Sequence, residues 1–361
     1  HAGESWAEVA ANLREHVVAV KARVSPHAPF GVGLRLSARA AQELTDGGLA
    51  ELRALLAAHD LYVFTINGFP YGTFHGVPVK EAVYRPDWRE PERLAYTRQL
   101  ADLLAQLLPQ GVDGSISTVP GCFRPRGDDP RALAEIAENL RAAAAHCAAI
   151  ERRTGARITI AIEPEPCCVI ETLAEAIALF TEHLRGVSHL GLCLDACHAA
   201  VEYEDLPAAL AALAAAGVPI AKLQLSAGLR VAPVGPAQRA ELVRFADSVY
   251  LHQVVARRGD ALVRYADLPA ALADPAAAHD REWRVHFHVP IVRDQLGAFA
   301  STQDFLAALL AHHRRAPLST QLEVETYTWD VLPAELRAAP IADAVAGELR
   351  WVIDQLSGEP S

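Results

Sequence analysis

The chain has 361 residues, with 33 Lys and Arg against 44 Asp and Glu, which gives a formal net charge of −11. This acidic balance argues against a general binder of nucleic acid or of anionic membranes, because binding to either depends on Lys and Arg side chains. Hydrophobic residues make up 51% of the chain, enough to build a large core. No apolar run approaches the roughly 18 residues of a membrane-spanning helix. Residues 1–6 contain neither a basic leader nor an apolar signal segment, so we expect a cytoplasmic protein.

The predicted elements alternate between strand and helix along the whole chain. In order they are a helix over 7–23, strand 31–36, helix 38–58, strand 61–67, helix 90–108, strand 114–120, helix 130–153, strand 157–163, helix 173–184, strand 190–195, helix 206–216, strand 220–225, helix 237–247, strand 284–289, helix 304–313, strand 320–325 and helix 341–356. Such alternation implies a parallel sheet, and eight strands favour a closed (β/α)8 TIM barrel over an open sheet. We expect one domain over 1–361, with an inserted segment around 250–290.

Several predicted strands carry aliphatic residues at one parity and small or polar residues at the other. Because alternate side chains of a strand face opposite sides, the polar set shares one face. We expect the aliphatic set under the helices and the polar set inside the barrel, concentrated at the carboxyl ends, where barrel enzymes hold their active sites. The polar residues predicted to face inward at these ends are Glu163, Glu165, Asp195, Gln224, His286, His288, Glu323 and Glu325.

Several carboxylates that point into one barrel mouth repel each other, and their burial is costly unless a cation lies between them. Carboxylate oxygens with an imidazole suit Mn, Zn, Co or Mg. We therefore predict a divalent metal ion, although each residue alone has an ordinary structural reading as a helix cap or an ion-pair partner. The candidate ligands are Glu163, Asp195, His198, Gln224, His288 and Glu325. The six Cys show no zinc-finger or disulfide spacing and are interpreted as packed, reduced thiols.

Other candidates are expected to contact a substrate. Asn67 ends the second predicted strand, and the Gly- and Pro-containing loop 68–75, with His75 at its end, is expected to lie over the barrel mouth. Lys80 binds substrate or forms a surface ion pair with Glu81, and Trp329 walls a pocket or packs against the last helix. The sequence contains no Gly-rich phosphate loop and no Gly-x-Ser-x-Gly motif, which argues against nucleotide-driven and serine-hydrolase chemistry.

These residues carry a resemblance to a known family. Glu163, the run 195–198 (Asp-Ala-Cys-His) and Glu325, each at a predicted strand end, resemble the xylose isomerase-like TIM-barrel superfamily. That superfamily includes sugar isomerases and epimerases and the endonuclease IV type of repair enzyme. More specifically, the chain resembles the EboE "metabolite traffic" family of bacterial operons. The matching segments are 3–6, 30–37, 65–75, 80–81, 163–166, 195–198 and 323–329.

The resemblance implies a ligand set and a strand count. Glu163, Asp195 and Glu325 would bind the metal with a His from the strand between the last two, but strand 220–225 carries Gln224 there. The fourth ligand is therefore Gln224 or His288. Alternatively, His286 and His288 bind a second metal, as in multi-zinc superfamily members. Relatives carry a short strand before the segment that matches 1–6, and the chain has no Met at all. We therefore expect the first strand to lie upstream of residue 1 and 284–289 to be inserted; otherwise the eight visible strands close the barrel.

The leading hypothesis is a metal-dependent isomerase or epimerase of a sugar-like or related small metabolite. Glu163 and Glu325 would act as acid and base around a metal-stabilised enediolate. The alternatives are an endonuclease IV-like phosphoester hydrolase and a non-catalytic component of a metabolite-export system. We expect a small-molecule partner rather than nucleic acid, with a homo-oligomer left open. The substrate-binding candidates are Asn67, His75, Lys80, Glu165, His198, His286, Glu323 and Trp329.

Overall fold

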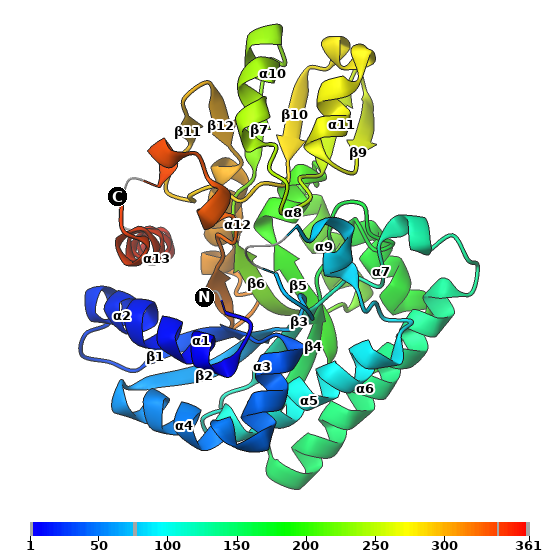
Figure 1. Ribbon diagram of the computed structural model, residues 1–361. Coiled ribbons are helices and arrows are strands. Elements are labelled where there is room, and N and C mark those ends of the chain that lie inside the picture. Colours follow the sequence, from blue (N-terminus) through cyan, green and yellow to red (C-terminus); the bar gives the residue numbers. More distant parts are fainter. Residues whose placement is uncertain (1–2, 75–77, 338, 359–361) are drawn as a thin grey trace.

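The computed structural model describes residues 3–74, 78–337 and 339–358. Seven parallel strands curve into a nearly closed barrel in the order β1-β2-β3-β4-β5-β6-β13, and helices surround it (Figure 1). The predicted parallel α/β barrel is therefore confirmed. The barrel strands are β1 (Phe30–Arg35), β2 (Leu61–Asn67), β3 (Gly114–Thr118), β4 (Ile158–Ile162), β5 (Leu190–Asp195), β6 (Ile220–Leu225) and β13 (Leu322–Val324).

Several helices begin at a residue whose side chain caps a free backbone N–H group. The Ser37 side chain accepts from the Ala40 N–H at the start of α3, and Thr172 with Glu175 forms a capping box at the start of α7. The helices are α1 (Trp6–Asn12), α2 (Val18–Val24), α3 (Ala38–Glu43), α4 (Leu49–Ala58), α5 (Pro91–Leu107), α6 (Ala132–Thr154), α7 (Leu173–Glu182), α8 (Ala196–Val201), α9 (Leu206–Ala216), α10 (Pro236–Leu242), α11 (Leu268–Ala273), α12 (Gln303–Arg315) and α13 (Ile341–Ser357). No helix of the described chain is long and apolar enough to cross a membrane.

The polar parity of the barrel strands faces inward, as predicted. The Ser115 hydroxyl on β3 lies 2.8 Å from the Thr65 hydroxyl on β2 and 2.5 Å from Gln321 Oε1, just before β13. Since β3 and β13 are not neighbours in the sheet, Ser115 and Gln321 meet through the barrel interior. Two residues further along the chain from Gln321, Glu323 of β13 forms an ion pair with the fully buried Lys222 of β6.

A second sheet is built on the barrel between β6 and α12. Its six antiparallel strands have the order β11-β12-β7-β10-β8-β9, and with α10 and α11 they form a separate lobe in Figure 1. The inserted part spans 229–301 and is wider than the predicted 250–290, because β7, β11 and β12 have only two or three residues each and too little alternation to be recognised. The strands are β7 (Leu229–Val231), β8 (Val254–Arg258), β9 (Ala261–Tyr265), β10 (Glu282–Val285), β11 (Gln295–Leu296) and β12 (Phe299–Ser301).

Several predicted elements differ from the structure, and two of them bear on the fold. The segment 284–289 is not a barrel strand: β10 pairs antiparallel with β7 and β8, and residues 286–289 are irregular. The interpretation of 284–289 as inserted is thus correct, and closure of the barrel by eight visible strands is wrong. The predicted helix 38–58 is interrupted by a π-helical turn at Leu44–Gly48, where Gly47 has a φ of 149° that only glycine adopts readily.

Candidate functional site

A cavity of about 320 Å³ opens at the carboxyl ends of the barrel strands. It lies between the barrel, the inserted sheet and α13. Its walls include ten of the residues predicted from the sequence: Asn67, Lys80, Glu163, Glu165, His198, His286, His288, Glu323, Glu325 and Trp329. A larger cavity, of about 730 Å³, lies at the amino ends of the strands and contains none of the candidate residues.

Three carboxylates meet at the base of this cavity. Glu163 follows β4, Asp195 ends β5 and Glu325 follows β13, and one oxygen of each lies within 4.8 Å of the other two. Asp195 is fixed at Oδ1, which accepts from the Ser226 hydroxyl at 2.7 Å and from the His198 backbone N–H at 2.9 Å. Glu325 accepts from the side-chain amides of Asn67 and Gln224. The three strand ends therefore bring these acidic groups together, with Glu163 and Asp195 buried and Glu325 half-buried.

The electrostatics of this group are unfavourable without a cation. Burial, followed by the charges of Glu325 and Asp195, raises the pKa of Glu163 well above its ordinary value. Burial and the charge of Asp195 raise the pKa of Glu325 to about 7. Carboxyl groups with raised pKa values that cluster in a cleft are typical of functional sites.

Three histidines lie beside the carboxylates. His198 Nε2 is 3.0 Å from His286 Nε2 and 3.9 Å from Asp195 Oδ2. Burial alone would lower the pKa of His198, but the charges of Asp195 and Glu165 outweigh it and raise that pKa. Burial lowers the pKa of His288 to about 4 and that of His286 well below its ordinary value, so these two imidazoles are neutral.

Four buried ligand atoms face this region without a hydrogen-bond partner among the described residues: Glu163 Oε2, Asp195 Oδ2, Gln224 Oε1 and His288 Nε2. Buried polar atoms in native proteins are nearly always paired, so an unpaired group of this kind indicates an ion or a ligand. Oxygen atoms with one imidazole nitrogen are the donors that divalent metals prefer. Both candidates for the fourth ligand, Gln224 and His288, thus fit a divalent cation together with the carboxylates.

The substrate-binding candidates occupy different surroundings. The Lys80 ammonium donates to Asp267 and to two backbone carbonyls of the insertion. Glu165 accepts from the Tyr84 hydroxyl at 2.7 Å, and Glu323 pairs with Lys222. Asn67, His198 and His286 contact the carboxylate group or each other, and Trp329 is half-buried at the wall. His75 lies outside the described residues.

An aromatic wall covers one side of the cavity, and one of its three rings, Tyr250, is not evident from the sequence. The rings of Phe74, Tyr250 and Tyr327 lie with centroids 4.9 to 5.9 Å apart. Tyr250 belongs to the irregular stretch of the insertion just before β8, where no periodic pattern marks it. Gln253, which binds His286, Glu165 and Tyr84, also lies there. Cys197 is a free, buried thiol, as interpreted from the sequence, and it also lies near His286 and His288.

Comparison with known proteins identifies related chains. A family model described as xylose isomerase-like TIM barrel matches residues 28–235, more than half of the chain. The structure of L-ribulose 3-epimerase is 13% identical in sequence, with a TM-score of 0.52. The match covers 99% of this chain and 91% of the epimerase chain. A xylose isomerase-like TIM barrel protein from Mycobacterium smegmatis in complex with magnesium is 14% identical, with a TM-score of 0.49, and covers 98% and 89%.

The IOLI protein with a bound zinc atom is 14% identical, with a TM-score of 0.48, and covers 92% of this chain and 89% of its own. At these identities the similarity to solved structures concerns the fold and not the activity. No curated protein matches the sequence. The narrower resemblance to the EboE family stays a prediction.

Proposed function

Because the chain belongs to the xylose isomerase-like TIM barrel family, we propose that it is a metal-dependent isomerase or epimerase of a sugar-like small metabolite. The observation that carries this proposal is the set of buried, unpaired ligand atoms of Glu163, Asp195 and Gln224, which come from three different strand ends. Glu163 lines a cavity of about 320 Å³, a volume within the range of small-molecule sites, and Asp195 lies beside Glu163.

The donor set fits a divalent cation, which Glu163, Asp195 and Glu325 would hold together with Gln224 or His288. When bound, such a cation supplies polarisation of neighbouring carbonyl and hydroxyl oxygens. The residues of the chain then perform the proton transfer. One of Glu163 and Glu325 removes the proton from the carbon next to the substrate carbonyl, and the other returns a proton to the adjacent position or to the opposite face. His198 orients the substrate oxygens, and the aromatic wall of Phe74, Tyr250 and Tyr327 excludes water from the reacting atoms.

The proposal is tested by hydrogen exchange. The purified chain, loaded in turn with Mn²⁺, Mg²⁺, Co²⁺ and Zn²⁺, is incubated with a panel of keto- and aldo-sugars in D₂O, and deuterium incorporation and new isomers are followed by NMR. We expect incorporation at the carbon next to the carbonyl for at least one sugar. Glu163→Gln and Glu325→Gln should each lower this rate by about 10² to 10⁴-fold, the usual contribution of a positioned acid or base.

The matched control is Glu138→Gln, which makes the same change on the exposed face of α6 and should leave the rate unaltered. A folded Glu325→Gln variant that keeps most of the exchange rate would show that Glu325 does not transfer the proton. An unaltered chain that exchanges no sugar hydrogen with any of the four metals would remove the proposal.

Phosphoester hydrolysis is the second candidate function. A further set of ligand atoms, from Asp195, His198 and His288, lies beside the carboxylates within the same 4.8 Å limit, which favours chemistry with more than one ion. Release of inorganic phosphate from phosphoester substrates, with no exchange of sugar hydrogen, would support this alternative.

A further inference from the structure

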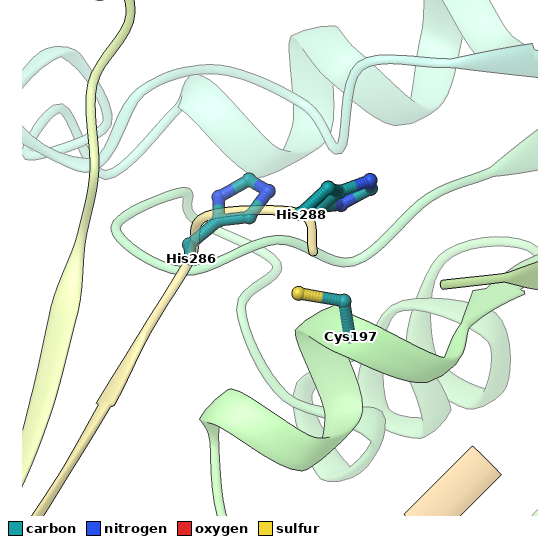
Figure 2. Close-up of side chains that lie close together, drawn as sticks. All are labelled: Cys197, His286 and His288. Carbon is teal, nitrogen blue, oxygen red and sulfur yellow. The ribbon is translucent and has the colours of Figure 1, made fainter. Parts of the chain in front are cut away.

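A thiol and two imidazoles converge beside the carboxylate group, on the side of the inserted sheet (Figure 2). Cys197 lies in the first turn of α8, and His286 and His288 lie on the irregular segment after β10. One ligand atom of each lies within 4.8 Å of the other two, and all three residues are buried. Figure 2 shows the Cys197 sulfur directed toward the segment that carries both histidines.

The hydrogen bonds of the histidines determine which ring nitrogen is available. His288 Nδ1 faces the backbone carbonyl of Glu325 at 3.2 Å, and His198 Nδ1 faces that of Pro164 at 3.0 Å. A carbonyl only accepts, so both Nδ1 atoms carry the hydrogen. In the neutral ring of His288 the Nε2 lone pair is therefore free.

His286 is held in the same tautomer by Gln253. The Gln253 amide nitrogen donates to Glu165 Oε1 and to the Pro166 carbonyl, which fixes the orientation of the amide group. Its oxygen is therefore the atom that lies 2.8 Å from His286 Nδ1, and this nitrogen carries the hydrogen. Histidines that bind metals donate the other ring N–H to a carbonyl or carboxylate in this way.

The Nε2 atoms of the three histidines differ in their partners. His288 Nε2 is buried with no hydrogen-bond partner among the described residues. His198 Nε2 and His286 Nε2 lie 3.0 Å apart. Two nitrogen lone pairs repel each other at this distance, so a proton or a cation must lie between them. Val201 and Val255 pack around Cys197 on the other side, so the sulfur lies against an apolar, water-poor wall.

We propose that Cys197, His286 and His288 form a second metal site, which binds Zn²⁺ beside the carboxylate group. A thiolate with two imidazoles is a soft donor set that selects Zn²⁺ over Mg²⁺ or Mn²⁺, whereas the three carboxylates suit the harder ions. Tetrahedral Zn²⁺ with its usual bond lengths needs donor atoms roughly 3.4 to 3.6 Å apart, so the observed 4.8 Å limit requires small side-chain rotations. With His288 engaged here, Gln224 Oε1 remains as the fourth ligand of the carboxylate site.

The inference does not rest on the proposed function, and a Co²⁺ titration tests it. Co²⁺ bound to a thiolate produces a charge-transfer absorption in the near ultraviolet, which oxygen ligands do not produce. The full chain, stripped with a chelator and titrated with Co²⁺, should show this band, and Zn²⁺ should displace it. Cys197→Ala should abolish the band and lower the Zn²⁺ affinity by at least about 100-fold, more than loss of an outer partner of a ligand does.

The matched control is Cys147→Ala, which removes an equally buried thiol from α6 and should keep the band. Glu163→Gln should also keep it, which separates this site from the carboxylate site and from the proposed activity. The inference is overturned if the unaltered chain shows no band or if the band persists in Cys197→Ala. If Cys197→Ala fails to fold, anomalous diffraction from crystals of the unaltered chain grown with Zn²⁺ decides: an ion bonded to Cys197 Sγ supports the site, and its absence there refutes it.

Discussion

Glu348 on α13 is a buried carboxyl group that forms no ion pair among the described residues. It is 3% exposed, and its Oε1 accepts from the Ile291 backbone N–H at 3.1 Å and from the Thr326 hydroxyl at 3.2 Å. Burial raises its pKa from 4.5 to about 7. These two bonds connect α13 to the inserted part and to the residue after Glu325, so Glu348, which itself lines the cavity, holds these segments together.

The sign of the pH effect follows from this raised pKa. As the pH rises from about 4.5 to about 7, the unfolded chain releases the Glu348 proton while the folded chain keeps it, so the folded state loses stability. Glu348→Gln keeps the acceptor oxygen and removes this loss. A difference of about 2.5 pKa units corresponds to about 3 kcal/mol above about pH 7. With an unfolding entropy of about 2.1 cal/mol/K per residue, this is about 4 °C in the unfolding temperature of a chain of this length.

Thermal unfolding of the two proteins at about pH 5 and about pH 8 measures this effect. We expect Glu348→Gln to unfold about 4 °C higher than the unaltered chain at the higher pH and about 1 °C higher at the lower. Glu90→Gln is the control of opposite sign: the hydrogen bond from Arg85 lowers the pKa of Glu90 to about 2, so the substitution should destabilise the fold equally at both pH values. A shift for Glu348→Gln that is the same at both pH values would refute the argument.

Three further predictions concern the site and its support. A Cβ at Gly33 would lie 1.6 Å from Glu323 Oε1, so Gly33→Ala should displace this carboxylate from the buried Lys222 and lower the free energy of unfolding by about 3 kcal/mol in urea titrations. Ser226→Ala removes the hydroxyl that positions Asp195 and should weaken Mn²⁺ binding by about 10 to 100-fold in calorimetry. Added Mn²⁺ at about 100 times its Kd should stabilise the chelator-treated chain by about 2.7 kcal/mol in unfolding experiments.

Matched variants check these three predictions. Gly347→Ala adds a Cβ in α13 with no atom within 4 Å and should be neutral or slightly stabilising. Ser319→Ala removes a hydroxyl that binds the Ala221 carbonyl at the other end of the barrel, and it should leave Mn²⁺ affinity unchanged. If Mn²⁺ still stabilises Glu163→Gln, the ion binds elsewhere. If Gly33→Ala and Gly347→Ala lower the free energy of unfolding equally, displacement of the Glu323 carboxylate does not explain the effect.

The sequence predicted the barrel and the acidic part of the site because both depend on local, periodic information. Alternation of strand and helix fixes a parallel sheet, and the period of two places Glu163, Asp195 and Glu325 on the inner face at strand ends. Parallel strands bring their carboxyl ends together, so these residues meet although more than 100 residues of sequence separate Asp195 from Glu325.

The insertion could not be delimited in this way, because its short strands form only through pairing with distant segments. The apparent strand 284–289 has good alternation, yet its first half pairs with β7 and β8 in the second sheet. His286 and His288 therefore lie on irregular backbone after β10. Sequence pattern alone cannot choose between two sheets that would both accept the same strand.

The sequence by itself therefore determined the architecture and the inward carboxylates, since side-chain periodicity is a property of the chain. Only the tertiary structure decided the surroundings that the insertion gives those carboxylates: the wall formed with Tyr250 and the approach of Cys197 to His286. These depend on how the inserted sheet lies on the barrel. That placement follows from packing between segments far apart in sequence, which no local pattern encodes.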